Sequence, residues 1–252
     1  MRFLTGGMFL VLITAACLAL GQSGLQFSAP SPPPKPLEKL TFNVEWRLVH
    51  AGTVTMEKQP HQESLKLESA GIVSTLFPVE DFYTVNFEDS LCATSSFLDA
   101  MERKRHRETK VTYDRAMNHA FFVERDVALN KILKETGTDI PHCVSDVMGA
   151  FAKLRAMNLE VGQSTEIPVS DGRKSALVKV TAQQREEVRT PLGAFQAIRY
   201  QADLMNGVVY TRKGEVFLWL SDDSRRLPVQ IRLRTGFPIG AVTVSLEKEE
   251  HP

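Results

Sequence analysis

The chain has 252 residues, of which 43% are hydrophobic and 24% are charged, the composition of an ordinary globular protein. Its 30 lysines and arginines balance its 30 aspartates and glutamates. Without an excess of basic residues, little counterion release is available to drive nucleic-acid binding, so we expect no nucleic-acid partner. The length allows one large β domain or two small ones.

The first residues follow the pattern of a signal peptide, which we place at residues 1–21. Arg2 supplies a short positive start, and residues 8–20 form an uncharged apolar run that is too short to cross a bilayer. Small residues at Ala19 and Gly21 predict cleavage before Gln22. We therefore expect the protein to be exported to the periplasm or another part of the cell envelope.

A lipoprotein signal is the alternative interpretation of this segment. Residues 14–17 would then form a lipobox, and acylation of Cys17 would tether the protein to a membrane. Thr14 stands where leucine is usual in such a motif, which favours ordinary cleavage. Membrane contact is expected only if Cys17 is lipidated, because no later apolar run of the sequence reaches the roughly 20 residues of a transmembrane helix.

Residues 22–37 hold five of the 13 prolines and predict a solvated, extended linker. Beyond it, apolar and polar residues alternate through most of the chain, beginning with Phe42, Val44, Trp46 and Leu48. This period of two is typical of half-buried strands. The chain is expected to turn at 51–52 into a second strand. We predict a single β-rich domain at residues 38–250.

Two further patterns refine the expected fold. Asp171 and Gly172 lie between two strand-like runs and predict a hairpin, because both residues tolerate a positive φ. Residues 142–158 place apolar side chains at helical spacing after Pro141 and predict one amphipathic helix. A helix with one apolar stripe in an otherwise β chain is expected to pack on a face of the sheet or to plug its open end. The predicted fold class is mainly β, a large curved antiparallel sheet, half-barrel or barrel-like, with one packed α-helix.

A resemblance to a known family rests on four segments. Residues 46–52, 143–155, 190–198 and 216–231 resemble the signature of a bacterial family known as domain of unknown function 3108. The likeness extends over roughly residues 38–248. It implies an exported, mostly β domain and no known activity, and it adds interest to Asp146, which lies in the second segment.

The densest run of charge, residues 102–110, is the first candidate binding site. In a strand, Arg103, Arg105 and Arg107 would lie on one face, where three guanidinium groups could hold an acidic head group or a sugar. The alternative is a solvated edge hairpin whose charges discourage aggregation, and this alternative is favoured.

Three other residues are candidate ligand contacts. Asp146 lies near the start of the expected helix, where a carboxylate complements the helix dipole, and a structural role is favoured for it. Trp46 and Trp219 lie on expected strands at opposite ends of the domain. Both are expected in the core, with the lining of an apolar cavity as the minority interpretation.

Cys92 and Cys143 remain after removal of the signal peptide. They are candidates for a disulfide, which would persist in an exported protein, or for two unrelated buried thiols. The six histidines show no metal-binding spacing, and the sequence contains no nucleophile elbow, redox CxxC or phosphate-binding loop. We expect no metal and no cofactor, and the missing motifs lower the expectation of an enzyme without removing it.

These observations favour a non-enzymatic envelope protein that binds a lipid, glycan or other amphiphile in the concave face of its sheet. The first alternative is an envelope assembly protein that docks a protein partner. An envelope hydrolase is the third and least favoured alternative.

Overall fold

The computed structural model describes residues 35–204, 214–235 and 240–251. The predicted signal peptide, Cys17 and all of the linker except residues 35–37 lie outside this part. The described chain is mostly β-strand, with two helices. Its elements are β1 (Glu38–Trp46), β2 (Val49–Gln59), β3 (Gln62–Ser69), α1 (Gly71–Leu76), β4 (Val79–Phe87), β5 (Ala93–Glu102), β6 (Arg105–Asp114), β7 (His119–Asp126), β8 (Lys131–Asp139), α2 (Val147–Ala156), β9 (Ser164–Ser170), β10 (Ser175–Thr190), β11 (Gly193–Ala202), β12 (Gly214–Ser221), β13 (Pro228–Thr235) and β14 (Ala241–Glu250).

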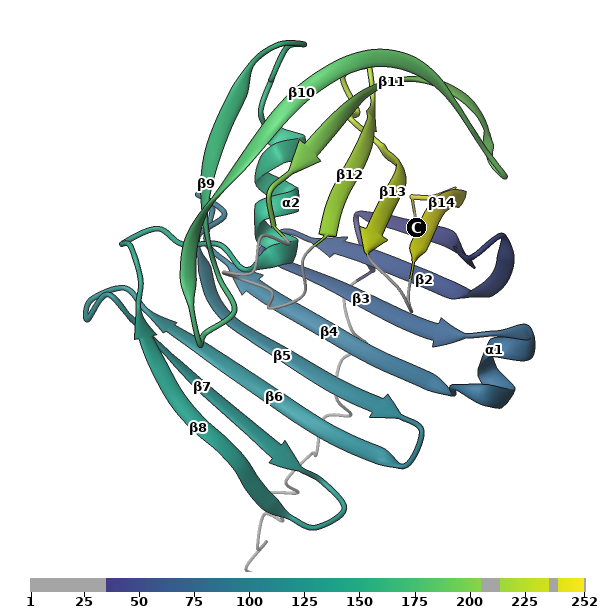
Figure 1. Ribbon diagram of the computed structural model, residues 1–252. Helices are drawn as coiled ribbons and strands as arrows, with labels where there is room; N and C mark the ends of the chain where they lie inside the picture. Colours follow the sequence, from purple (N-terminus) through teal and green to yellow (C-terminus); the bar gives the residue numbers. More distant parts are fainter. Residues whose placement is uncertain (1–34, 205–213, 236–239, 252) are drawn as a thin grey trace, which may run out of the picture. The chain divides into compact units, whose positions relative to one another are not determined.

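The strands form one antiparallel sheet of 14 strands that does not close (Figure 1). Its order is β8-β7-β6-β5-β4-β3-β2-β1-β14-β13-β12-β11-β10-β9. The first and last strands therefore pair at the middle of the sheet, while β8 and β9 form its two edges. We call β1–β8 the N-terminal half and β9–β14 the C-terminal half. The predicted fold class, a large curved antiparallel sheet, is confirmed.

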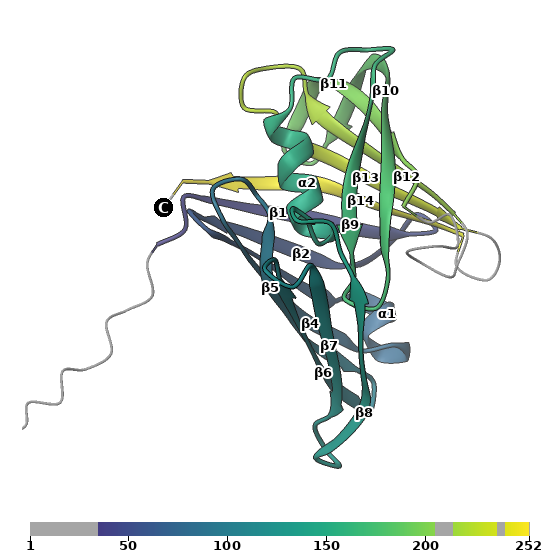
Figure 2. The ribbon, with the colours of Figure 1, turned by 90° about the vertical axis from the view of Figure 1, so that its left-hand side faces the viewer.

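The helix α2 lies within the curve of the C-terminal half, as both views show (Figures 1 and 2). Its buried Leu154 packs against residues of β9, β10 and β11, including Ile167, Val180 and Tyr200. Alternation explains this arrangement, because every second side chain of each strand points to the helix side of the sheet. A second apolar cluster around Phe42 lies at the β1–β14 seam, and a third around Val85 lies in the N-terminal half.

Three sequence predictions need correction. The first turn lies at Arg47 and Leu48, both at positive φ, and not at 51–52. Gly52 lies inside β2, where an added Cβ would overlap the carbonyl oxygen of Glu68 on β3. The helix begins at Val147 instead of residue 142, because the segment before it is bonded to neighbouring strands. A short second helix, α1, connects β3 to β4 and was not predicted.

The predicted β9–β10 hairpin is present. Its connection spans residues 171–174, and Gly172 has a φ of 81°. The side chain of Val111 on β6 lies against Gly172, and the Tyr113 hydroxyl donates to the Ser170 carbonyl at 3.0 Å. The tip of this hairpin therefore rests on the N-terminal half of the sheet.

Candidate functional site

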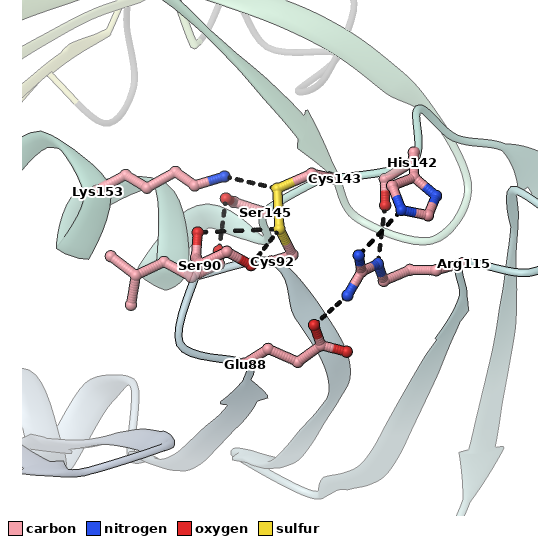
Figure 3. The surroundings of a disulfide bond; sticks show 9 residues. Glu88, Ser90, Cys92, Arg115, His142, Cys143, Ser145 and Lys153 are labelled. Atoms are coloured by element: carbon pink, nitrogen blue, oxygen red, sulfur yellow. Dashed lines mark hydrogen bonds and ion pairs between the residues drawn. A yellow bond between two sulfur atoms is a disulfide. The ribbon is translucent and has the colours of Figure 1, made fainter.

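The segment that leads into α2 is attached to the N-terminal half by a disulfide. Cys143, before the helix, is bonded to Cys92, which directly precedes β5 (Figure 3). The neighbouring Ser145 hydroxyl donates to the Leu91 carbonyl at 3.1 Å, and the Ala93 amide donates to the Val144 carbonyl at 2.8 Å. Of the two interpretations left open by the sequence, the structure has the disulfide.

The same segment is also bonded to the C-terminal half. The Ser145 amide donates to the Pro168 carbonyl at 3.0 Å, and the Ser170 amide donates to the Ser145 carbonyl at 2.9 Å, which forms a short parallel bridge with β9. One short stretch of chain thus connects both halves of the sheet and sets the position of the helix N-terminus.

Asp146 caps that N-terminus. Its Oδ1 accepts from the Gly149 amide at 2.8 Å, and its Oδ2 accepts from the Met148 amide at 3.1 Å and from the Tyr83 hydroxyl at 2.6 Å. Burial raises the pKa of Asp146, although these three hydrogen bonds act in the opposite direction. Burial likewise raises the pKa of Tyr83 well above its ordinary value. The carboxyl group that the sequence singled out therefore has a structural role that Tyr83 shares.

The C-terminal end of α2 is held by an ion pair. The Arg155 guanidinium donates to both carboxylate oxygens of Glu38 at 2.8 and 3.0 Å, and its Nε donates to the Arg226 carbonyl at 3.1 Å. Both charged side chains are largely buried. The helix is thus fixed at both ends, and its middle part covers the space between the helix and the sheet.

An apolar cavity of about 390 Å³ lies between α2 and the sheet. Both halves contribute to it, so it exists only when they are assembled. Its lining from the helix includes Ala150 and Phe151, and its lining from the strands includes Met56, Val216 and Leu218. Aliphatic and aromatic side chains make up this lining almost entirely, which suits a hydrocarbon.

A second cavity, also of about 390 Å³, adjoins the first, because Leu65, Val147 and Met148 line both. Its walls are partly polar. They comprise Leu65, Leu67, Asp81, Tyr83, Ser96, Leu98, Thr109, Val111, Tyr113, Phe122, Asp146, Val147, Met148, Ser170, Asp171 and Arg173. Asp171 and Arg173 come from the tip of the β9–β10 hairpin, where they form an ion pair at 2.6 Å. We call the two spaces the apolar cavity and the polar cavity.

Asp81 is the most distinctive group of the polar cavity. Its Oδ1 is buried and has no hydrogen-bond partner among the described residues. Burial raises the pKa of Asp81 to about 6, and the nearby carboxylates of Glu102 and Asp99 act in the same direction. A buried acceptor without a hydrogen-bond partner costs free energy. A ligand that donates a hydrogen bond would recover this cost.

The arginine candidates do not form the predicted row. Arg103 lies in the β5–β6 turn at a φ of 58°, because β5 ends at Glu102 and β6 begins only at Arg105. Its guanidinium donates to the Leu76 carbonyl at 2.9 Å and stacks on Phe77. The expectation that all three arginines share one strand face is therefore wrong for Arg103.

Arg105 and Arg107 do share a face of β6, and it is the face of Thr109 and Val111, which line the polar cavity. Neither arginine lines either cavity. The Arg107 guanidinium forms an ion pair with Glu124 at 2.8 Å.

The two tryptophans also lie outside the lining of both cavities. Trp219 is buried, and its indole nitrogen donates to Glu186 at 2.7 Å. Its neighbours Val216 and Leu218 on β12 point to the apolar cavity instead. Trp46 is half-buried in the cluster at the β1–β14 seam, next to the Arg47 guanidinium. Trp219 is thus a buried core residue, whereas Trp46 is partly buried and packs against its cluster.

Sequence reasoning missed Asp81 and Tyr83 as site residues. Tyr83, Val85 and Phe87 alternate with polar residues along β4, and Asp81 lies on the same face two residues earlier. A carboxyl group on the apolar face of a strand indicates a candidate site residue. The alternation does not reveal that the Tyr83 hydroxyl bonds to Asp146, because the two residues lie 63 positions apart in the chain.

The described residues contain neither a helix that could cross a membrane nor a cluster of metal-binding side chains. No helix in this part of the chain is long and apolar enough to cross a membrane. Within the same ranges, no three or more histidine, cysteine, aspartate or glutamate side chains gather where a metal ion could bind.

One solved structure supports the fold at very low sequence identity, and another is less similar. A beta-barrel-like protein of domain of unknown function DUF1849 from Brucella abortus aligns with a TM-score of 0.55 and 7% identity over 86% of this chain and 98% of its own. A DUF1089 family protein from Pseudomonas aeruginosa gives a TM-score of 0.42 and 14% identity over 73% of this chain and 90% of its own. The first likeness supports the fold alone, and the second is too distant to support it.

The curated proteins contain no match to this chain. The family model described as "Protein of unknown function (DUF3108)" matches residues 41–247, which include the disulfide, α2 and all the described residues that line the two cavities. The resemblance noted in the sequence is thereby confirmed, and the chain belongs to the DUF3108 family.

Proposed function

We propose that this protein is a non-enzymatic binding protein for an amphiphile, whose hydrocarbon part occupies the apolar cavity and whose head group occupies the polar cavity. The observation that carries the proposal is that the two cavities adjoin and share Leu65, Val147 and Met148 in their walls. Each has a volume within the usual range for small-molecule sites. An apolar space next to a polar one matches the two parts of an amphiphile.

The charges of the polar cavity favour a head group that is not anionic. Asp81 and Asp146 are carboxyl groups, and Arg173 is already paired with Asp171. A phosphate or carboxylate would be placed near two acidic groups without a free positive charge of the cavity to receive it. Hydroxyl or amine donors would instead supply the hydrogen bond that Asp81 Oδ1 lacks. We therefore propose a polyol, sugar or amine head group.

The proposed location is the cell envelope. The predicted signal peptide and the Cys92–Cys143 disulfide support it together, because disulfides persist in oxidising compartments outside the cytoplasm. The proposal includes neither metal nor cofactor.

Native mass spectrometry of the processed protein, purified from its own host and followed by denaturing lipid and glycan analysis, is the direct test. A stoichiometric amphiphile with a hydroxyl-rich or amine head group is the expected result. An empty protein, prepared without detergent, would contradict the proposal and favour the docking of a protein partner.

A matched pair of variants tests the position of the hydrocarbon. Ala150 lines the apolar cavity, whereas Ala156 lies on the same helix and is exposed. Ala150→Phe fills part of the cavity and should weaken the binding of a fluorescent acyl probe by about tenfold or more, because buried hydrocarbon contributes about 0.8 kcal/mol per methylene. Ala156→Phe should leave probe binding unchanged. Equal binding by both variants would place the probe elsewhere.

Head-group selection is tested by comparing a monoacylglycerol with the fatty acid of the same chain length. At neutral pH the wild-type protein should bind the monoacylglycerol more tightly, because the acidic cavity disfavours a second carboxylate. Asp81→Asn removes one of the carboxyl groups and should narrow the difference between the two ligands by about tenfold, the effect of about 1.4 kcal/mol. A preference for the fatty acid in the wild-type protein would refute the proposed head group while leaving the apolar cavity intact as a site.

A further inference from the structure

Three connections lie side by side at one end of the N-terminal half, and we call their exposed surface the α1 edge. It comprises residues 47–50 of the β1–β2 turn, residues 71–78 in and after α1, and residues 101–105 of the β5–β6 turn. The Ala70 amide donates to the Ala51 carbonyl at 2.8 Å, which joins α1 to β2. The Arg103 amide donates to the Pro78 carbonyl at 2.8 Å, which joins the β5–β6 turn to the segment after α1. Figure 1 shows α1 projecting from this end of the sheet.

Large apolar side chains are exposed along the whole α1 edge. Leu48 is 94% exposed, Ile72 is 65% exposed and Leu76 is 57% exposed. Val49, Phe77 and Met101 are exposed as well. Single exposed apolar residues are common on protein surfaces, but a contiguous group of them marks an interaction site.

The backbone conformation indicates independently that Leu48 does not stabilise the fold. Arg47 and Leu48 have φ values of 52° and 68° and form the tight β1–β2 turn. Such positions are normally occupied by asparagine or glycine, because a Cβ is strained in the left-handed region. A leucine here contributes almost no burial and adds strain. Strain of this kind is retained where a side chain serves another role.

Positive charge accompanies the apolar side chains. The three segments contain Arg47, Arg103, Lys104 and Arg105 against a single acidic residue, Glu102. The whole chain has equal numbers of basic and acidic residues, so the excess is local. Exposed apolar side chains surrounded by basic ones are typical of proteins that dock onto the surface of anionic membranes.

We propose that the α1 edge docks the protein onto a lipid surface that contains anionic lipids. Leu48, Ile72 and Leu76 enter the boundary between head groups and acyl chains, while Arg47 and Lys104 face lipid phosphates. This contact is peripheral and reversible, and it requires neither acylation of Cys17 nor an occupied cavity.

Vesicle flotation with the processed chain, beginning at Gln22, tests this surface. The wild-type protein should float with vesicles of phosphatidylcholine and phosphatidylglycerol and bind more weakly to vesicles of phosphatidylcholine alone. Leu48→Gly together with Leu76→Ser should lower binding to the anionic vesicles by about tenfold or more, because two exposed leucines no longer transfer into the interface. Leu177→Ser is the matched control, since Leu177 is 59% exposed on β10 in the other half of the sheet.

A thermal measurement separates docking from folding. Leu48→Gly alone should leave the melting temperature unchanged or higher, because glycine adopts this φ without strain and the leucine side chain makes little contact. Loss of vesicle binding without loss of stability therefore supports the proposal. Failure of the wild-type protein to bind anionic vesicles, or equal binding by the double variant and the control, would overturn it. None of these results depends on the ligand content of the cavities.

Discussion

At the scale of single residues, the concave side of the sheet contains buried carboxyl groups that ordinary cores avoid. Glu63 on β3 is 4% exposed, and its burial raises its pKa to about 7, although Arg155 and Lys58 nearby act to lower it. Burial is also the main reason why the pKa values of Asp81 and Asp146 are raised. Near neutral pH, part of this acidic set therefore carries protons in the folded protein.

The pH dependence of stability follows from the sign of these shifts. Between the ordinary glutamate pKa of 4.5 and about 7, folded Glu63 keeps a proton that the unfolded chain releases, so stability falls as pH rises through this window. Glu63→Gln should remove this contribution to the pH dependence of the unfolding free energy. It should stabilise the protein at about pH 8 by on the order of 1 to 3 kcal/mol. Urea unfolding at about pH 5 and about pH 8 measures the effect.

The control for this experiment is Glu68→Gln, which changes an exposed glutamate of the same strand. This variant should show the same change in unfolding free energy with pH as the wild-type protein. If Glu63→Gln also retains the full slope, the buried glutamate does not titrate in the window stated above.

At the scale of elements, α2 is positioned by its attachments more than by its own helical tendency. It has only ten residues, and isolated helices of that length are marginal in water. The disulfide and the Asp146 cap hold its start, and the Arg155–Glu38 pair holds its end. The helix covers the apolar cavity because these attachments fix both ends across it.

Loss of the disulfide should therefore cost considerable stability. Cys92 and Cys143 are separated by 51 residues, and closing a loop of that length in the unfolded chain is worth about 4 kcal/mol. The double variant Cys92→Ser, Cys143→Ser should lower the free energy of unfolding by about this amount in urea titrations. A reducing agent should have the same effect on the wild-type protein and none on the variant. An unchanged unfolding midpoint in the variant would show that the disulfide does not constrain the unfolded chain.

At the scale of the whole described unit, the chain runs from the middle of the sheet to one edge, crosses through α2, and returns from the other edge to the middle. The β1–β14 pairing that results has register from Lys39–Glu250 to Trp46–Val242. The two edge strands of the sheet, β8 and β9, have different surroundings. Lysines of β8 are exposed at one edge, which discourages pairing with other chains, and Ser145, in the segment before α2, bridges to β9 at the other.

Hydrogen exchange should reflect this architecture. Amides of β1 and β14 are paired on both sides at the centre of the sheet, whereas β8 is an edge strand whose first five residues are exposed. We expect β8 to exchange fastest among the strands and β1 and β14 to exchange slowest. Mass-spectrometric exchange of peptides from 131–139 and 38–46 gives the comparison. Equal protection of the two peptides would mean that the described sheet opens as one unit.

Much of the fold could be predicted from local pattern. The alternation beginning at Phe42 and Val44 identified β1, and the apolar spacing after Pro141 identified α2. The site was less accessible to prediction. Asp146 was expected near the helix start in a structural role, but Arg103 was assigned to a strand because an alternating charge pattern does not reveal a turn in which Arg103 has a positive φ.

The sequence by itself determined the properties that depend on neighbouring residues: strand alternation, the amphipathic helix, the export signal as an expectation, and a family likeness that the family model confirms. The tertiary structure alone decided that β1 pairs with β14, that α2 lies in the C-terminal half, and that Tyr83 meets Asp146. These contacts join residues far apart in the chain. They depend on the curvature of the sheet and on which face each strand presents after all others are placed, which no local pattern encodes. The two adjoining cavities arise in the same way, because their walls come from both halves of the sheet.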